Sequence, residues 1–140
     1  DMMNQRIAEL GCNESHFANP SGLNDDTQRT TAYDMAIIAR ACFQNPTVLE
    51  IASARTSTIP ATANNPNGRT FSIEHKMLLS DDSNYYPDAI AGKTGWTSQA
   101  GQTLVTYARR EGRGQIAVTL KPIIQIQRPF WISALQNSRM

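Results

Sequence analysis

The sequence predicts an α+β domain in which helices come first along the chain and an antiparallel sheet follows. Three observations support this class. Apolar residues recur at helical spacing in the first half. Short β-branched segments dominate after residue 88, and a Gly-containing tip joins the last two of them. The 140 residues, 40% of them hydrophobic, suffice for one globular domain that buries about two-thirds of its unfolded surface.

The chain begins with the end of a helix and continues into a long loop. Met3, Ile7 and Leu10 fall at helical spacing, and Gly11 supplies a C-terminal stop. Residues 12–30 have no period and are rich in Asn, Asp, Ser, Pro and Gly, which predicts a turn-dominated loop. Loops of this length usually have a function.

A second helix is expected to begin at Thr31, which forms the pattern of a capping box with Asp34. Asn45 and Pro46 interrupt this helix and are expected to start a short third one, as its cap and its first residue. The apolar stripe of the second helix is Tyr33, Ile37, Ile38 and Ala41.

The remaining elements are predicted to be strands. Two short ones surround the turn signal NNPNG, and three longer ones follow the polar loop DDSNYYPD. The last two are joined by the tip RREGRG, which predicts an antiparallel meander. The five ranges are 55–59, 69–73, 89–94, 102–108 and 115–120.

Composition excludes several classes of function. A net charge of +1 argues against nucleic acid as the main partner, because that binding requires a surplus of Lys and Arg. No apolar stretch approaches the roughly 20 residues of a membrane span. Cys12 and Cys42 form no CxxC pair and leave the redox compartment open. His16 and His75 belong to no cluster of ligand spacing, so we expect structural or surface histidines and no metal.

The segment AGKTGWTSQAG carries the candidate chemistry, because it places Lys93, Thr94 and Gly95 at the end of a predicted strand. An ammonium and a hydroxyl side by side can bind a carboxylate through charge-assisted hydrogen bonds. Gly95 removes a side chain where a ligand backbone would lie, and the next N–H, that of Trp96, is then free to face an oxyanion.

Three blocks of the sequence resemble the serine D-alanyl-D-alanine carboxypeptidases, the low-molecular-mass penicillin-binding proteins. The blocks are SHFANPSGL, TTAYDMAIIAR and IAGKTGWTSQAGQTLVTYARREGRGQIAVTL, in the order and at the spacing of that family. The match runs from about Met3 to Lys121. It implies the penicillin-recognising serine transferase fold, an antiparallel sheet with helices on both faces, present here in part.

The resemblance also implies roles for individual residues. Lys93, Thr94 and Gly95 match the KTG motif, whose Lys and Thr bind the terminal carboxylate of a D-Ala-D-Ala stem peptide of peptidoglycan, or of a β-lactam. The backbone N–H of Trp96 resembles one oxyanion-hole donor. The family uses no cofactor, and its location is extracytoplasmic, in the bacterial periplasm or cell envelope. The loop that shapes the chain near the site is represented by His16, Asn19, Pro20, Gly22 and Leu23.

The departures from the family pattern concern the nucleophile. Family members acylate the Ser of S-x-x-K, assisted by a second Ser in S-x-N. No Ser here has a Lys three residues later or an Asn two residues later. We therefore expect residues 1–121 to be the C-terminal portion of the domain and the chain alone to be inactive. FSIEHKMLL also departs from the family at Glu74 and His75, where an Asn-rich strand is usual.

Two alternatives stay open. A non-catalytic module that binds β-lactams or muropeptides would retain only the carboxylate-binding motif. A related serine β-lactamase or transpeptidase would use the same KTG strand, although the HFANPSGL loop favours the carboxypeptidase.

The tail, residues 122–140, matches nothing that the family has at this place, and we interpret it as frameshifted. In the frame that starts at the third base of each codon, the last base of the Phe130 codon and the first two of the Trp131 codon encode Leu. The last base of the Trp131 codon and the first two of the Ile132 codon encode Asp. The family has a Leu-Asp pair there. The alternative is a divergent natural C-terminus, and resequencing the source DNA distinguishes the two.

Overall fold

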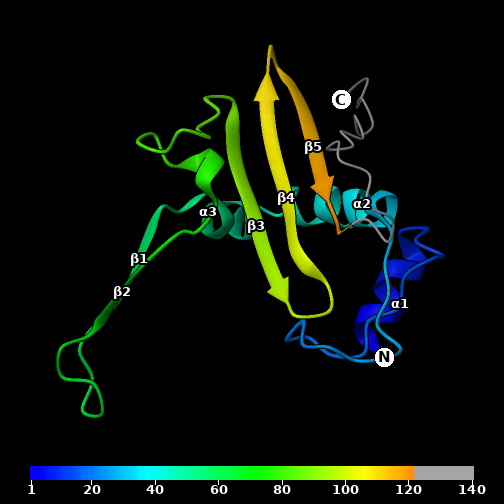
Figure 1. Ribbon diagram of the computed structural model, residues 1–140, viewed down its shortest axis with the longest axis horizontal. Helices are drawn as coiled ribbons and strands as arrows, with labels where there is room; N and C mark the ends of the chain where they lie inside the picture. Colours follow the sequence, from blue (N-terminus) through cyan, green and yellow to red (C-terminus); the bar gives the residue numbers. More distant parts are fainter. Residues whose placement is uncertain (122–140) are drawn as a thin grey trace.

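The computed structural model describes residues 1–121, and the predicted frameshifted tail lies outside them. Three helices and a short hairpin precede a sheet, as the sequence predicts (Figure 1). A 3-10 turn, η1, was not predicted. The elements are α1 (Met2–Glu9), α2 (Ala32–Phe43), α3 (Pro46–Ser53), β1 (Thr56–Ile59), β2 (Arg69–Ser72), η1 (Lys76–Leu78), β3 (Ala89–Thr97), β4 (Gly101–Arg110) and β5 (Arg113–Thr119).

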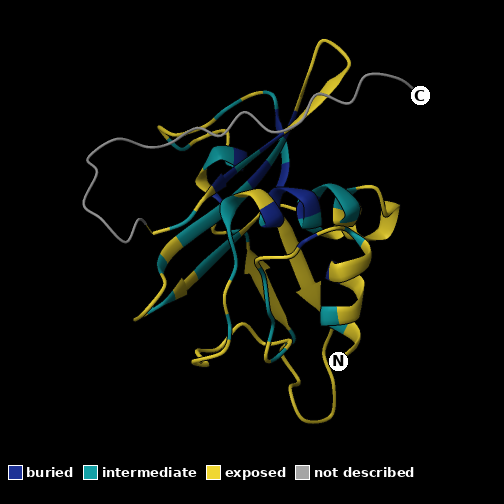
Figure 2. Ribbon diagram, turned by 90° about the vertical axis from the view of Figure 1, so that its right-hand side faces the viewer, coloured by how far each residue is buried: buried dark blue, intermediate teal, exposed yellow. Residues whose placement is uncertain are grey.

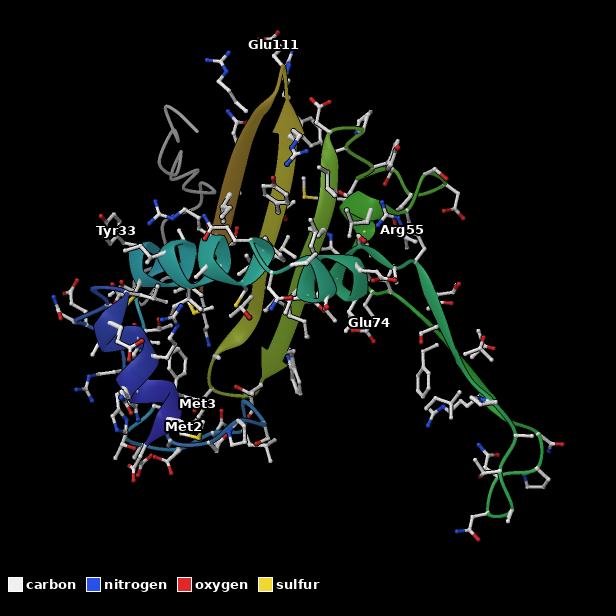
Figure 3. The ribbon with its side chains drawn as sticks, turned by 180° about the vertical axis from the view of Figure 1, so that it is seen from behind. Met2, Met3, Tyr33, Arg55, Glu74 and Glu111 are labelled. Carbon is white, nitrogen blue, oxygen red and sulfur yellow. The ribbon has the colours of Figure 1, made fainter. Side chains whose placement is uncertain are left out.

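The main sheet is an antiparallel meander in the order β3-β4-β5, while β1 and β2 form a separate ribbon. Helix α2 packs on β5 and β4, and α3 packs on β3. The β1–β2 ribbon projects away from this body, and all of its strand residues are exposed (Figures 1 and 3). Within residues 1–121, no helix is long and apolar enough to cross a membrane.

The core lies where α2 crosses the sheet (Figure 2). Small residues on the helix, Ala36 and Ala39, face branched residues on β5, Ile116 and Val118. Small side chains let the helix approach the sheet closely enough for the branched ones to fill the space between them. The helix end is held by an aromatic stack, with the rings of Phe43 and Tyr107 5.4 Å apart.

The predicted capping box is only half formed. The Thr31 hydroxyl accepts a hydrogen bond from the Asp34 N–H at 3.1 Å, as a cap does. The Asp34 carboxylate does not complete the box. It is buried and accepts from the Ser15 hydroxyl at 2.7 Å and from the Glu14 N–H at 3.1 Å. The carboxylate therefore ties the long loop to α2, a tertiary use that local sequence cannot reveal.

The 12–30 loop has a defined shape although it contains no helix or strand. His16 and Arg29 form an isolated antiparallel bridge. The Asn4 side chain on α1 accepts a hydrogen bond from the Phe17 N–H at 2.8 Å and donates one to the Phe17 carbonyl oxygen at 2.9 Å. These polar contacts replace the regular ladder that the loop lacks.

The tip between β4 and β5 is tighter than predicted. The strands extend through Arg110 and from Arg113, so only Glu111 and Gly112 form the turn. Both have positive φ, 51° and 76°, which is the geometry of a type I′ hairpin turn. The prediction that all of RREGRG forms the tip is wrong, because a two-residue turn lets Arg110 and Arg113 pair across the ladder.

Replacing Glu111 by Asn should stabilise this hairpin (Figure 3 labels the residue at its tip). Asn tolerates positive φ better than Glu, so we expect the free energy of unfolding to rise by about 1 kcal/mol. The lost ion pair with Arg113 is exposed and should contribute less than that. Urea denaturation of Glu111→Asn measures the gain, with Glu111→Gln as the control. A loss of stability in Glu111→Asn would contradict the assignment of the turn.

Candidate functional site

The Lys93–Trp96 segment lies inside strand β3 and not at its end. The strand was predicted to stop at Thr94 but continues to Thr97. It continues because Gly95 pairs with Thr103 and Trp96 with Gln102 in the ladder with β4. This correction places the motif on regular, extended backbone supported by a neighbouring strand.

Among the described residues, β3 is an edge strand. In an antiparallel edge strand, every second residue directs its N–H and C=O away from the neighbour. Such an edge offers backbone donors and acceptors to an extended ligand. The Trp96 side chain at this edge is 72% exposed, so contacts with the described residues leave most of the indole open to solvent.

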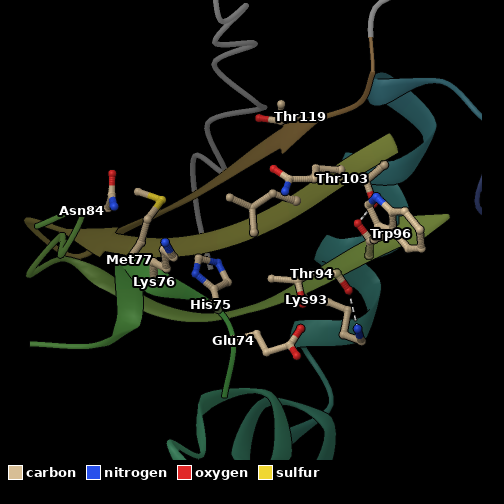
Figure 4. A pocket seen from close by; sticks show the side chains of 13 residues that line it. Glu74, His75, Lys76, Met77, Asn84, Lys93, Thr94, Trp96, Thr103 and Thr119 are labelled. Atoms are coloured by element: carbon tan, nitrogen blue, oxygen red, sulfur yellow. Dashed lines mark hydrogen bonds between the residues drawn. The ribbon is translucent and has the colours of Figure 1, made fainter. Parts of the chain in front are cut away.

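A cavity of about 710 Å³ borders this edge (Figure 4). Three segments line most of it: Glu74–Met77, Lys93–Trp96 and Gln102–Leu104. The sequence predicts the second segment as a candidate site but not the other two. The alternation of Gln102 and Leu104 on a strand was a usable signal, since both side chains point to the same face of the sheet.

The cavity is rich in cations relative to carboxylates. Lys93 is exposed, and its ammonium donates to the Thr94 carbonyl oxygen. No ion pair forms between Lys93 and a carboxylate within residues 1–121. Lys76 also lines the cavity, and Glu74 is its one carboxylate. An accessible ammonium that no acid neutralises is suited to bind an anion.

Packing against β4 favours glycine at position 95, which the sequence alone did not show. A Cβ at this position would lie 2.6 Å from the hydroxyl oxygen of Thr103. That hydroxyl donates to the Gly95 carbonyl oxygen at 3.3 Å. The space beside Gly95 is thus taken by a residue of β4, independently of any ligand.

Substituting Gly95 by Ala should therefore lower stability through this contact. We expect Gly95→Ala to cost about 1–3 kcal/mol, as overpacking does. Thr103→Ala should cost about 1 kcal/mol or less by itself, and should restore part of the loss when combined with Gly95→Ala. Thermal unfolding of the two single variants and the double variant measures this coupling. If the losses of stability in the two single variants simply add in the double variant, the Thr103 hydroxyl is not what excludes a side chain at position 95.

His75 lies at the inner edge of the cavity and is 1% exposed. Its Nε2 is 3.0 Å from the Thr106 hydroxyl oxygen, so it is the hydrogen-bonded structural histidine that we expected. Burial is the main cause that lowers the pKa of His75, and the charge of Arg55 acts in the same direction. The ring is consequently neutral at pH 7.

The lowered pKa of His75 predicts that stability depends on pH. The unfolded histidine, with a pKa of about 6.5, binds a proton more readily than the native one. Stability is thus complete above pH 6.5 and is lost as the pH falls through the native pKa. Urea denaturation between pH 7.5 and 5.5 should show this loss in the wild type and a smaller one in His75→Gln. His16→Gln is the matched control. If the pH dependence of stability disappeared in His16→Gln and not in His75→Gln, its attribution to His75 would be refuted.

The loop residues lie on a self-contained turn. The Asn19 side chain accepts from the Gly22 N–H and donates to the Leu23 carbonyl oxygen, at 2.9 and 3.1 Å. Gly22 has φ +76°. His16 Nδ1 lies 3.1 Å from the Thr27 carbonyl oxygen. None of the predicted loop residues, including Pro20, is among the residues that line the cavity at β3.

Comparison with known proteins identifies the family. The sequence model of the D-alanyl-D-alanine carboxypeptidases, peptidase family S11, matches residues 1–122. The chain belongs to this family. A D-alanyl-D-alanine carboxypeptidase of Mycobacterium tuberculosis is 32% identical over 135 residues, which cover 94% of this chain and 44% of the relative. One of Bacillus subtilis is 27% identical over 116 residues, covering 83% of this chain and 28% of the relative.

Solved structures of this carboxypeptidase family and its neighbours share the fold. A crystal structure of the Mycobacterium tuberculosis D-alanyl-D-alanine carboxypeptidase has a TM-score of 0.73 and 30% identity, over 88% of this chain and 44% of that one. The Streptomyces K15 DD-transpeptidase has a TM-score of 0.74 and 26% identity, over 84% and 44%. These likenesses confirm the predicted α+β fold class. The chain spans less than half the length of these relatives.

Proposed function

We propose that the whole protein of which this sequence forms part is a serine-type D-alanyl-D-alanine carboxypeptidase of peptidoglycan maturation. The observation that carries the proposal is the Lys93-Thr94-Gly95 segment, with Lys93 exposed, on β3, the edge strand of the described sheet, in a chain of this family. The substrate would be a stem peptide ending in D-Ala-D-Ala, and β-lactams would bind as its mimics. The location would be the bacterial periplasm or cell envelope.

The proposed site chemistry follows from the geometry of the edge. The Lys93 ammonium, which has no carboxylate partner among the described residues, would exchange its bond to the Thr94 carbonyl for the substrate carboxylate. The Thr94 hydroxyl would add a second hydrogen bond. The Trp96 N–H would stabilise the oxyanion of the tetrahedral intermediate. No S-x-x-K serine occurs in these 140 residues, so this chain supplies binding groups and not the nucleophile.

A DD-transpeptidase is the second candidate, because the Streptomyces K15 enzyme of that name shares the fold at a TM-score of 0.74. The two reactions share the acyl-enzyme and differ in the acceptor, which is water for hydrolysis and an amine for transpeptidation. The proportion of the two products therefore separates the candidates.

The test uses the complete gene product and the peptide diacetyl-Lys-D-Ala-D-Ala. We expect release of D-Ala without an added amine, and a fall in kcat/KM of about tenfold or more in Lys93→Ala, because a charge-assisted bond to the substrate is lost. Arg110→Ala removes an exposed cation at the end of β4; it is the matched control and should keep full activity.

Three further results bear on the same proposal. Products formed only with an amine acceptor would favour the transpeptidase. Faster turnover of a chromogenic cephalosporin than of the peptide would favour a β-lactamase. The 140-residue chain incubated with penicillin should show no covalent adduct by intact-mass spectrometry, and an adduct would overturn the assignment of the missing nucleophile.

A further inference from the structure

The proposed function leaves one buried polar side chain beside the site without a role. The His75 side chain is almost completely buried, yet its Nδ1 has no hydrogen-bond partner among residues 1–121. A buried polar atom without a partner is unfavourable, so apolar residues are more usual at such a position. The position of this ring therefore needs a reason other than core packing.

The imidazole occupies the space where Gly92 would carry a side chain. A Cβ on Gly92 would lie 2.5 Å from both Cδ2 and Nε2 of the ring, and 2.4 Å from the Val105 carbonyl oxygen. Gly92 directly precedes Lys93. The ring thus rests on the backbone that leads into the carboxylate-binding segment, and a displaced ring would let this backbone move.

The same ring is held from the neighbouring strand. Thr106 of β4 is the cross-strand partner of Gly92, and its hydroxyl oxygen lies 3.0 Å from His75 Nε2. The imidazole therefore lies over the cross-strand pair of Gly92 and Thr106, where it is hydrogen-bonded to Thr106 and packs against Gly92. This pair is one residue before Lys93 in the ladder. Figure 4 shows His75 beside this part of the cavity.

We propose that His75 is a positioning residue: its neutral ring, bonded to Thr106, sets the backbone at Gly92 and thereby the direction in which Lys93 and Thr94 face a bound carboxylate. The carboxylate part of this inference rests on the proposed function. The coupling between the ring and the strand does not rest on it, so the two are tested separately.

Burial, and to a smaller extent the charge of Arg55, favours the neutral form of the ring. Arg55, which precedes β1, and Lys93 on β3 are cations, and Glu74 and Lys76 flank the histidine in sequence. Burial lowers the pKa of His75, and Arg55 adds to this. A protonated ring carries N–H on both nitrogens. The Thr106 hydroxyl can still accept from Nε2–H, but Nδ1–H then has no partner among residues 1–121 and the buried ring carries a charge. Protonation should consequently release the contact on Gly92.

The first experiment follows the backbone amides of the 140-residue chain by NMR between pH 8 and 5. We expect the Gly92, Lys93 and Thr94 amides to shift with the same midpoint as the His75 ring protons. In His75→Gln these shifts should disappear, while His16→Gln should retain them. The chain has two histidines, so the ring signals are simple to assign. Amides that show no shift, or that shift equally in His75→Gln, would overturn the proposal whatever the protein binds.

The second experiment measures binding of diacetyl-Lys-D-Ala-D-Ala to the same chain at pH 7.5. His75→Leu and Thr106→Val should each weaken binding about tenfold, and the double variant no further, since both remove one hydrogen bond. His75→Gln and Thr106→Ser retain that bond and should recover most of the affinity. Thr70→Val, on exposed strand β2, is the matched control.

The outcomes separate the two claims. Unchanged affinity in both His75→Leu and Thr106→Val would refute the positioning role. Absence of peptide binding by the wild type, together with coupled amide shifts, would refute the carboxylate site while the link between His75 and β3 stands.

Discussion

The antiparallel ladder between β3 and β4 is the interaction on which the candidate site depends. It continues without a break from Ala91 to the turn after Thr97, so Lys93, Thr94 and Trp96 lie on one extended segment. An extended backbone fixes the spacing of successive side chains and N–H groups at about 3.3 Å per residue. A ligand-binding segment in a loop would have to order this geometry on binding, whereas a strand already holds it.

The rest of the described fold supports this ladder from its two faces. On one face, α2 covers the sheet by packing Ala36 and Ala39 against the branched residues of β5, and α3 contacts β3. On the other, the η1 segment brings His75 and Met77 to the Thr106 hydroxyl. Consecutive β4 residues alternate between these faces, which is why Val105 packs toward the helix while Thr106 bonds the histidine. The candidate site therefore lies on β3, the edge strand of the described sheet, and extends over the neighbouring residues of β4.

Most elements of the fold were predictable because their signals are local. Thr31 and Asn45 cap helices through atoms two or three residues away. Branched residues in alternation identified the strands. The errors came from positions where pairing across the sheet decides the outcome. Gly95 suggests a strand end by itself, but its partner Thr103 keeps it in the ladder. The arginines next to the β4–β5 turn are polar and suggest a loop, but they belong to the strands, and Glu111 and Gly112 alone form the turn.

The sequence by itself determined the family, the helix caps and the position of the Lys93-Thr94-Gly95 segment that we propose binds a carboxylate, since each of these depends on neighbouring residues. Only the tertiary structure decided what surrounds that segment. The Asp34 carboxylate appeared to complete a local cap but binds the distant loop. His75 appeared to be an isolated departure from the family, yet it bonds Thr106, 31 residues away, and fills the space over Gly92. Contacts of this kind depend on which residues the folded sheet brings together, and no spacing along the chain encodes them.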